Sequence, residues 1–173
     1  MLAITGTVPS EDFPLVSGDI TLEDSHIRIR NELIPVNRGT AALMAAAVKT
    51  AETIDHPAPF GYLVGDIGRG KGSRILYKYM TEDLPHASFQ TLVFHYLQPI
   101  VHWHERLQHS LRAMKERPTL IADAGFMYAA KMSGQSAFYD LFTPDIGELA
   151  FLADEKAPHP FYTRGFILHE ENR

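Results

Sequence analysis

Hydrophobic and polar positions along the chain predict strands that alternate with helices. Positions 20–36 (ITLEDSHIRIRNELIPV) place isoleucines and arginines in alternation, which is typical of one or two antiparallel or exposed-edge strands. From Thr40 to Ile54, alanine, leucine and methionine recur at helical spacing, so this segment predicts a helix. Pro57 and Pro59 end it, because proline does not continue a helix.

Short apolar runs then alternate with further helical segments. Runs of this kind, without polar interruption, are typical of strands that are covered on both faces. A strand–helix order predicts βαβ units and a mostly parallel sheet. We therefore predict an α/β fold in a single domain over residues 1–173. The expected strands are Phe60–Val64, Phe89–Tyr96, Thr119–Ala122 and Leu141–Thr143, and the expected helices are Ser73–Met80, His102–Lys115, Phe126–Met132 and Ile146–Leu152.

The composition narrows the class of protein. The net charge of −5 and the absence of lysine or arginine runs argue against a nucleic-acid partner. The chain has no cysteine, which excludes disulfides, thiolate metal sites and cysteine nucleophiles. No apolar run approaches the roughly 18 residues that a membrane span needs, and the N-terminus lacks the features of a signal peptide. We expect a cytoplasmic protein with no membrane partner.

Ligands of parallel α/β sheets bind beyond the carboxyl ends of the strands. Four segments of this chain follow predicted strands and therefore become candidates for the site. They are the loop Gly65–Gly72, the segment after Tyr96, the stretch Asp123–Gly125 and the stretch Thr143–Asp145.

The glycine loop, in LVGDIGRGKGSRIL, approaches two phosphate-binding templates and matches neither. The Walker A pattern GxxxxGK[ST] fails because Gly72 stands in the Ser/Thr place and Ser73 comes one residue late. The dinucleotide pattern GxGxxG fails because the loop contains GxGxG and does not follow the first strand. Glycines still let backbone N–H groups approach an anion, and the helix that follows adds its positive end. We expect a ligand-contacting loop, the alternative being a mobile loop that only needs positive φ; its candidate residues are Gly65, Asp66, Gly68, Gly70 and Lys71.

Carboxylates follow the last two predicted strands. Asp123 comes directly after one of them, where a carboxylate can bind a hydroxyl, a metal or a phosphate-bound cation; the alternative is a helix N-cap. Thr143 and Asp145 precede the last helix, and Glu148 follows three residues after Asp145. This spacing is that of a capping box, and the three residues are also candidates for ligand contact.

Nine histidines raise the question of a metal site. His102 and His104 are two residues apart, so on a helix their side chains point in different directions. No complete pattern of metal ligands is present, and we expect no metal site. His95, at the end of a predicted strand, is the histidine that we keep as a candidate for ligand contact.

Three segments, VGDIGRGKGS, LIADAGFM and LFTPDIGELAFL, follow one another in the chain. Their order resembles three motifs of the carbohydrate-kinase-like branch of the ribokinase superfamily: a GPGLG-like loop, a DAD-like strand end and an LTPHxGE segment. The resemblance covers about residues 37–152 and implies a three-layer α/β/α, ribokinase-like fold. It implies a carbohydrate kinase or an ATP/ADP-dependent NAD(P)H-hydrate dehydratase, with ATP or ADP as cofactor, allowing for Mg²⁺, and a small-molecule substrate such as an NAD(P)H hydrate. It also implies a homo-oligomer.

The chain departs from the family pattern at ligand-facing positions. Asp66 replaces the proline of the loop, Gly125 replaces the second aspartate, and Asp145 stands where the family has histidine. The family's downstream GxGD motif, which carries the catalytic base, has no counterpart, so no catalytic residue is assigned. We expect a piece that lacks the C-terminal part of the family fold; the alternative is a non-catalytic nucleotide- or metabolite-binding module.

Overall fold

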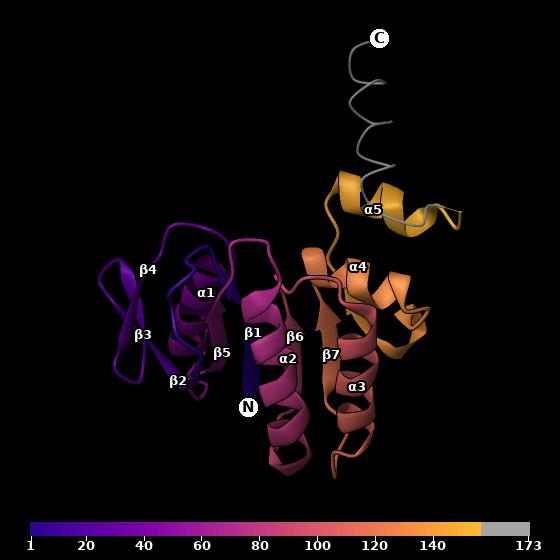
Figure 1. The fold of residues 1–173 in the computed structure, drawn as a ribbon. Coiled ribbons are helices and arrows are strands. Elements are labelled where there is room, and N and C mark those ends of the chain that lie inside the picture. The colour runs from indigo at the N-terminus through magenta and orange to yellow at the C-terminus, as the bar shows by residue number, and fades with distance from the viewer. Residues whose placement is uncertain (157–173) are drawn as a thin grey trace.

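The computed structural model describes residues 1–156, in an α/β fold with one eight-stranded mixed sheet (Figure 1). The predicted domain runs to residue 173, and its last 17 residues lie outside the described part. The strands are β1 (Leu2–Val8), β2 (Val16–Glu23), β3 (His26–Ile29), β4 (Glu32–Pro35), β5 (Phe60–Gly65), β6 (Thr91–Phe94), β7 (Thr119–Ala122) and β8 (Leu141–Phe142). The α-helices are α1 (Gly39–Thr53), α2 (Lys71–Asp83), α3 (Val101–Arg112), α4 (Gly125–Met132) and α5 (Ile146–Ala153), with short 3₁₀ turns at Leu84–His86 and Ser136–Phe138.

The strand order is β4-β3-β2-β5-β1-β6-β7-β8. Strands β5, β1, β6, β7 and β8 are parallel to one another, whereas β2 pairs antiparallel with β5 and continues the sheet through β3 and β4 in antiparallel pairs. The sheet is therefore mixed, with four parallel and three antiparallel pairings, so the prediction of a mostly parallel sheet holds only for β5, β1, β6, β7 and β8. Two of the antiparallel pairings, β2–β3 and β3–β4, are hairpins, and such short connections reach only an antiparallel neighbour. The antiparallel character predicted for 20–36 is confirmed, with three strands in place of one or two.

The central strand β1 escaped the sequence analysis because polar and small residues interrupt its apolar pattern. Thr5 is buried, and its hydroxyl donates a hydrogen bond to the Sδ of Met80 on α2, at 3.2 Å. A Cβ at Gly6 would lie 2.5 Å from the Oγ1 of Thr40, so only glycine lets α1 approach the strand this closely. Both residues serve contacts with distant helices, which a local pattern does not reveal.

Helices α2, α3 and α4 cover one face of the sheet and α1 packs on the other, so the central strand β1 is buried on either side (Figure 1). Ala3 of β1 packs in the cluster that contains the apolar faces of α2, α3 and α4. Its neighbour Ile4 points to the opposite face and packs with Met44 and Val48 of α1. Every helix and strand predicted from residue 40 onward is present, with bounds within three residues of those expected.

His104 of α3 is a buried polar residue of this core. Its Nε2 lies 2.7 Å from the hydroxyl of Tyr139, and its Nδ1 lies 2.9 Å from the Oγ of Ser133. Burial lowers the pKa of His104 from 6.5 to about 4, because a charged imidazole would lose its hydration. At neutral pH the ring is therefore neutral and tied to both neighbours.

This histidine predicts a loss of stability in mild acid. The unfolded chain binds a proton at His104 below its ordinary pKa of 6.5, whereas the folded chain resists protonation down to about pH 4. The free energy of unfolding is therefore not reduced by His104 above pH 6.5. Between pH 6.5 and pH 4 this group lowers it by about 3 kcal/mol. Urea unfolding at pH 7.5 and pH 4, with His104→Gln as the comparison, measures this. An identical loss in the variant would contradict the assignment.

Candidate functional site

A cleft of about 520 Å³ lies where the direction of the chain connections changes. After β1 the chain continues to β2, which lies beyond β5 on one side of β1. After the neighbouring strand β6 it continues to β7, on the other side. Sheets of this kind bind ligands at such a switch point, beyond the carboxyl ends of the strands. The walls of the cleft come from the segments after β1 and β6, the start of α1 and the loop after β5.

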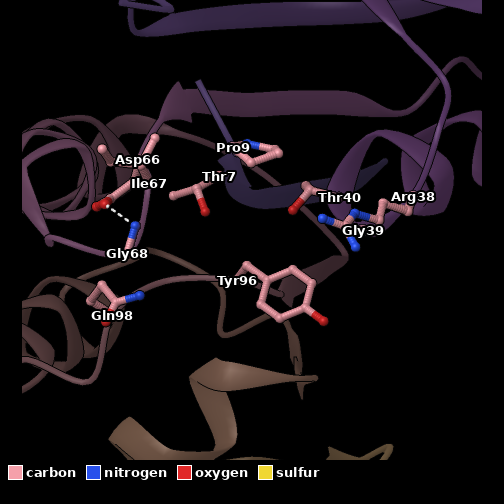
Figure 2. Close-up of a pocket in the computed structure, with 10 residues that line it drawn as sticks. All are labelled: Thr7, Pro9, Arg38, Gly39, Thr40, Asp66, Ile67, Gly68, Tyr96 and Gln98. Atoms are coloured by element: carbon pink, nitrogen blue, oxygen red, sulfur yellow. Dashed lines mark hydrogen bonds between the residues drawn. The ribbon is translucent and has the colours of Figure 1, made fainter. Parts of the chain in front are cut away.

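Hydrogen-bonding side chains line this cleft (Figure 2). The hydroxyl oxygens of Thr7 and Thr40 both point into the open space above the ring of Tyr96. Tyr96 is 48% exposed, so one aromatic face is open to a ligand. Arg38, just before α1, and the amide of Gln98 complete the polar lining. A few polar groups beside one aromatic surface are typical of a small-molecule site.

Asp66 of the glycine loop forms hydrogen bonds within its own loop. Its Oδ1 accepts the N–H groups of Gly68 and Gly70, each at 3.0 Å. Its Oδ2 accepts both the backbone N–H and the hydroxyl of Ser73, each at 2.8 Å. The loop amides that we expected to contact a ligand anion are thus bonded to a carboxylate of the chain. An anion would have to displace Asp66 to reach them.

The charge of Asp66 is stabilised by these bonds. Burial by itself would raise the pKa of Asp66, but the hydrogen bonds from Ser73, Gly70 and Gly68 outweigh it and hold the pKa below its ordinary value. The carboxylate also lies at the start of α2, where the positive end of the helix dipole favours an anion. The negative group at this helix start therefore belongs to the protein.

The predicted loop residues separate between two hollows. Asp66 and Gly68 line the main cleft. Gly65 and Lys71 line a second hollow of about 290 Å³ between the start of α2 and the loop that follows β1. Asp66 borders both hollows, so the loop forms a partition between them.

His95 and Asp123 lie behind the cleft and are connected to it through Thr40. The Nδ1 of His95 is 2.9 Å from the Oγ1 of Thr40. Its Nε2 is 3.6 Å from the Oδ2 of Asp123. Burial lowers the pKa of His95, and the charge of Asp123 only partly opposes this, so the ring is neutral at neutral pH.

Asp123 does not cap the helix that follows it, which was the alternative reading of its position. The N-cap of α4 is Ala124, and no side chain caps the first N–H groups within that helix. The Oδ1 of Asp123 instead accepts the N–H of Ala124, at 2.8 Å. Ala124 has φ = +49°, a conformation that costs a residue with a side chain some free energy. The carboxylate of Asp123 is thereby held toward His95.

Thr143, Asp145 and Glu148 do not line the cleft. Asp145 and Glu148 form the capping box that their spacing indicates. The Oδ1 of Asp145 accepts the N–H of Glu148 at 2.8 Å, and the Oε2 of Glu148 accepts the N–H of Asp145 at 2.9 Å. Thr143 is exposed just before this helix. A role of the three in ligand contact stays a prediction.

The sequence analysis missed several residues of the cleft. Thr7 lies near the end of the unpredicted strand β1, and Arg38 and Thr40 stand at the start of α1. No local signal points to Arg38 and Thr40, because α1 follows β4, which runs antiparallel to β1 and β5. Tyr96 and Gln98 belong to the segment after β6, which was among the expected positions.

Among residues 1–156, no helix is both long enough and apolar enough to cross a membrane. In the same part of the chain, no group of three or more His, Asp or Glu side chains is placed to hold a metal ion.

The comparison with curated proteins finds a relative in the archaeon Methanocaldococcus jannaschii. The chain is 41% identical to the uncharacterized protein MJ1337 over 125 residues, which is 72% of this chain and 49% of the relative. The chain thus spans about half the length of the curated relative that it matches. No family model matches the chain. No solved structure matches it.

Proposed function

We propose that this chain is the substrate-binding part of a ribokinase-like small-molecule enzyme, a carbohydrate kinase or an ATP/ADP-dependent NAD(P)H-hydrate dehydratase. The observation that carries the proposal is the polar cleft at the switch point between β1 and β6. Its 520 Å³ lies within the range of small-molecule sites, which span roughly 300–1,000 Å³.

The arrangement of the motif segments supports the family resemblance. The segment VGDIGRGKGS follows β5, and LIADAGFM contains β7 and Asp123, so both place residues beyond the carboxyl edge of one sheet. Helices on both faces of the sheet fit the three-layer arrangement that the resemblance implies. The homo-oligomer, the nucleotide and Mg²⁺ belong to the same proposal and rest on the resemblance.

Each residue of the cleft has a chemical role in this proposal. Thr7, Thr40 and Gln98 form hydrogen bonds to a polar substrate, and the open face of Tyr96 packs against its ring. Arg38 at the mouth pairs with a negatively charged group, such as a phosphate of the substrate or of a nucleotide. The proposal assigns binding and orientation to these residues and assigns no catalytic base.

A non-catalytic nucleotide- or metabolite-binding module is the second candidate, and one observation favours it. The amides of Gly68, Gly70 and Ser73 would be available to a phosphate in a catalytic glycine loop, but here they bond to Asp66. A module that binds a ligand without transferring a phosphoryl group does not need free backbone amides in this loop to hold a phosphate.

Thermal unfolding with ATP, ADP, NADH and a panel of sugars, beside a turnover assay, tests both candidates. A ligand at 100 times its Kd is expected to stabilise the chain by about 2.7 kcal/mol. Tyr96→Ala and Arg38→Ala are expected to weaken binding about tenfold each, the effect of about 1.4 kcal/mol. Arg106→Ala on α3, where the guanidinium lies over Trp103 outside the cleft, is the matched control.

The outcomes separate the candidates. Stabilisation with turnover supports the enzyme, and stabilisation without turnover supports the binding module. Unchanged affinity in both cleft variants would contradict the assignment of the site, as would the absence of any stabilising ligand.

A further inference from the structure

Three polar side chains from separate segments form a line that runs from the cleft into the interior. Thr40 at the start of α1 faces the cleft, His95 after β6 contacts it from behind, and Asp123 after β7 lies beyond the histidine. Thr40 is 1% exposed and His95 7% exposed, so solvent does not compete for their bonds. The proposed function gives Thr40 a hydrogen bond to the substrate but does not say which partner donates the hydrogen.

The carboxylate of Asp123 decides which ring nitrogen of His95 carries the proton. At 3.6 Å the Oδ2 atom faces Nε2, and a lone pair on that nitrogen would repel the negative charge. A proton on Nε2 is attracted to it instead. Since the ring is neutral, Nδ1 is then the unprotonated nitrogen and accepts a hydrogen bond.

The hydroxyl of Thr40 must therefore donate its hydrogen to His95, at 2.9 Å. A hydroxyl has one hydrogen and two lone pairs, so the oxygen keeps only lone pairs for a second partner. Figure 2 shows this oxygen pointing into the cleft. Gly6 leaves room for the side chain, since a Cβ there would lie 2.5 Å from the same oxygen.

We propose that Thr40, His95 and Asp123 make this part of the cleft a hydrogen-bond acceptor that selects a ligand with an alcohol hydroxyl at that position. A carboxylate or sulfate oxygen has no hydrogen to give at neutral pH and is rejected there. The positive charge of Arg38 in the same cleft opposes an ammonium group, and the carboxylate of Asp66, which also lines the cleft, is already held by four hydrogen bonds within its loop. Thr40 touches the ligand, and His95 and Asp123 are positioning residues. The inference rests on the proposed function only in that the cleft binds a ligand.

The tautomer of His95 is measured on the free protein, by ¹⁵N NMR of the histidine rings. The wild type is expected to carry the proton on Nε2. In Asp123→Asn the amide NH₂ donates to Nε2, so the proton moves to Nδ1 and the Thr40 hydrogen turns to the cleft. A proton on Nδ1 in the wild type, or an unchanged tautomer in the variant, overturns the inference whatever the cleft binds.

Ligand selection is measured by ligand-observed NMR with D-ribose, D-glucose, glycerol and inorganic sulfate. Thr40→Val keeps the shape of the side chain without the hydroxyl and is expected to weaken polyol binding about tenfold, whereas Thr40→Ser is expected to retain it. Polyol binding that is equal in the valine variant, or sulfate binding that depends on the Thr40 hydroxyl, overturns this inference and leaves the proposed function standing. If none of the polyols binds to the wild type, the inference of hydroxyl selection is overturned. Thermal unfolding with ATP, ADP and NADH then shows separately whether the proposed function is also wrong.

Discussion

Replacing Gly72 with alanine is expected to lower the free energy of unfolding by about 5 kcal/mol, or to prevent folding. The start of α2 crosses the end of β5 so closely that a Cβ at Gly72 would lie 1.9 Å from the carbonyl oxygen of Gly65. Backbone atoms cannot rotate away as a side chain can, so the helix itself would have to move. The loop between the two elements, which borders the cleft, would move with it.

Urea unfolding of the variant measures this effect. Gly147→Ala in α5 is the matched control, because its Cβ would meet only the Oδ1 of Asp145 at an ordinary 3.4 Å. There the better helix propensity of alanine is expected to leave stability unchanged or raise it by about 1 kcal/mol. A loss at Gly72 no larger than the change at Gly147 would show that α2 yields easily and would contradict the close packing.

Replacing Asp66 with alanine is expected to cost about 4 kcal/mol of stability, since four hydrogen bonds to one carboxylate are lost. The donors stay in place, and the amides of Gly70 and Ser73 are buried, so water replaces the lost partner poorly. The loop is expected to loosen as well, because Asp66 is the residue that fixes Gly68 and Gly70.

The same variant has a pH signature. The pKa of Asp66 lies below its ordinary value of 3.8, so its bonds contribute fully above that pH and are lost as the pH falls through the lower, folded value. Asp66→Ala is therefore expected to unfold less steeply with acid below pH 4 than the wild type. Asp145→Ala, which removes an exposed capping residue of α5, is the control and is expected to cost about 1 kcal/mol. Equal losses in the two variants would show that Asp66 is an ordinary cap.

The helices were predictable because their signals are local. Apolar residues of α1 recur at the spacing of a helix face. Asp145 and Glu148 form the capping box of α5 within four consecutive residues. The strand β1 was not predictable in this way. Thr5 and Gly6 interrupt its apolar pattern because they contact Met80 and Thr40. These partners lie 75 and 34 residues away in the chain.

In the glycine loop, the residue composition indicated an anion site but did not identify the anion. Glycines and basic residues ahead of a helix predicted an anion near the loop, and an anion is present there. It is the carboxylate of Asp66, and the hydrogen bonds that hold it depend on loop geometry that the sequence pattern does not specify. Whether the loop also contacts a ligand stays a prediction that Asp66→Ala can address.

The sequence by itself determined the helices, the strands after residue 40 and the segments in which ligand contacts were to be sought, because periodicity, caps and glycine loops act over a few residues. Only the tertiary structure decided that the sheet is mixed, that β1 is its central strand and that Thr40, His95 and Asp123 meet. The first two of these residues are 55 positions apart, and their contact follows from the order of strands in the sheet. Strand order is set by burial over the whole molecule, to which every segment contributes at once.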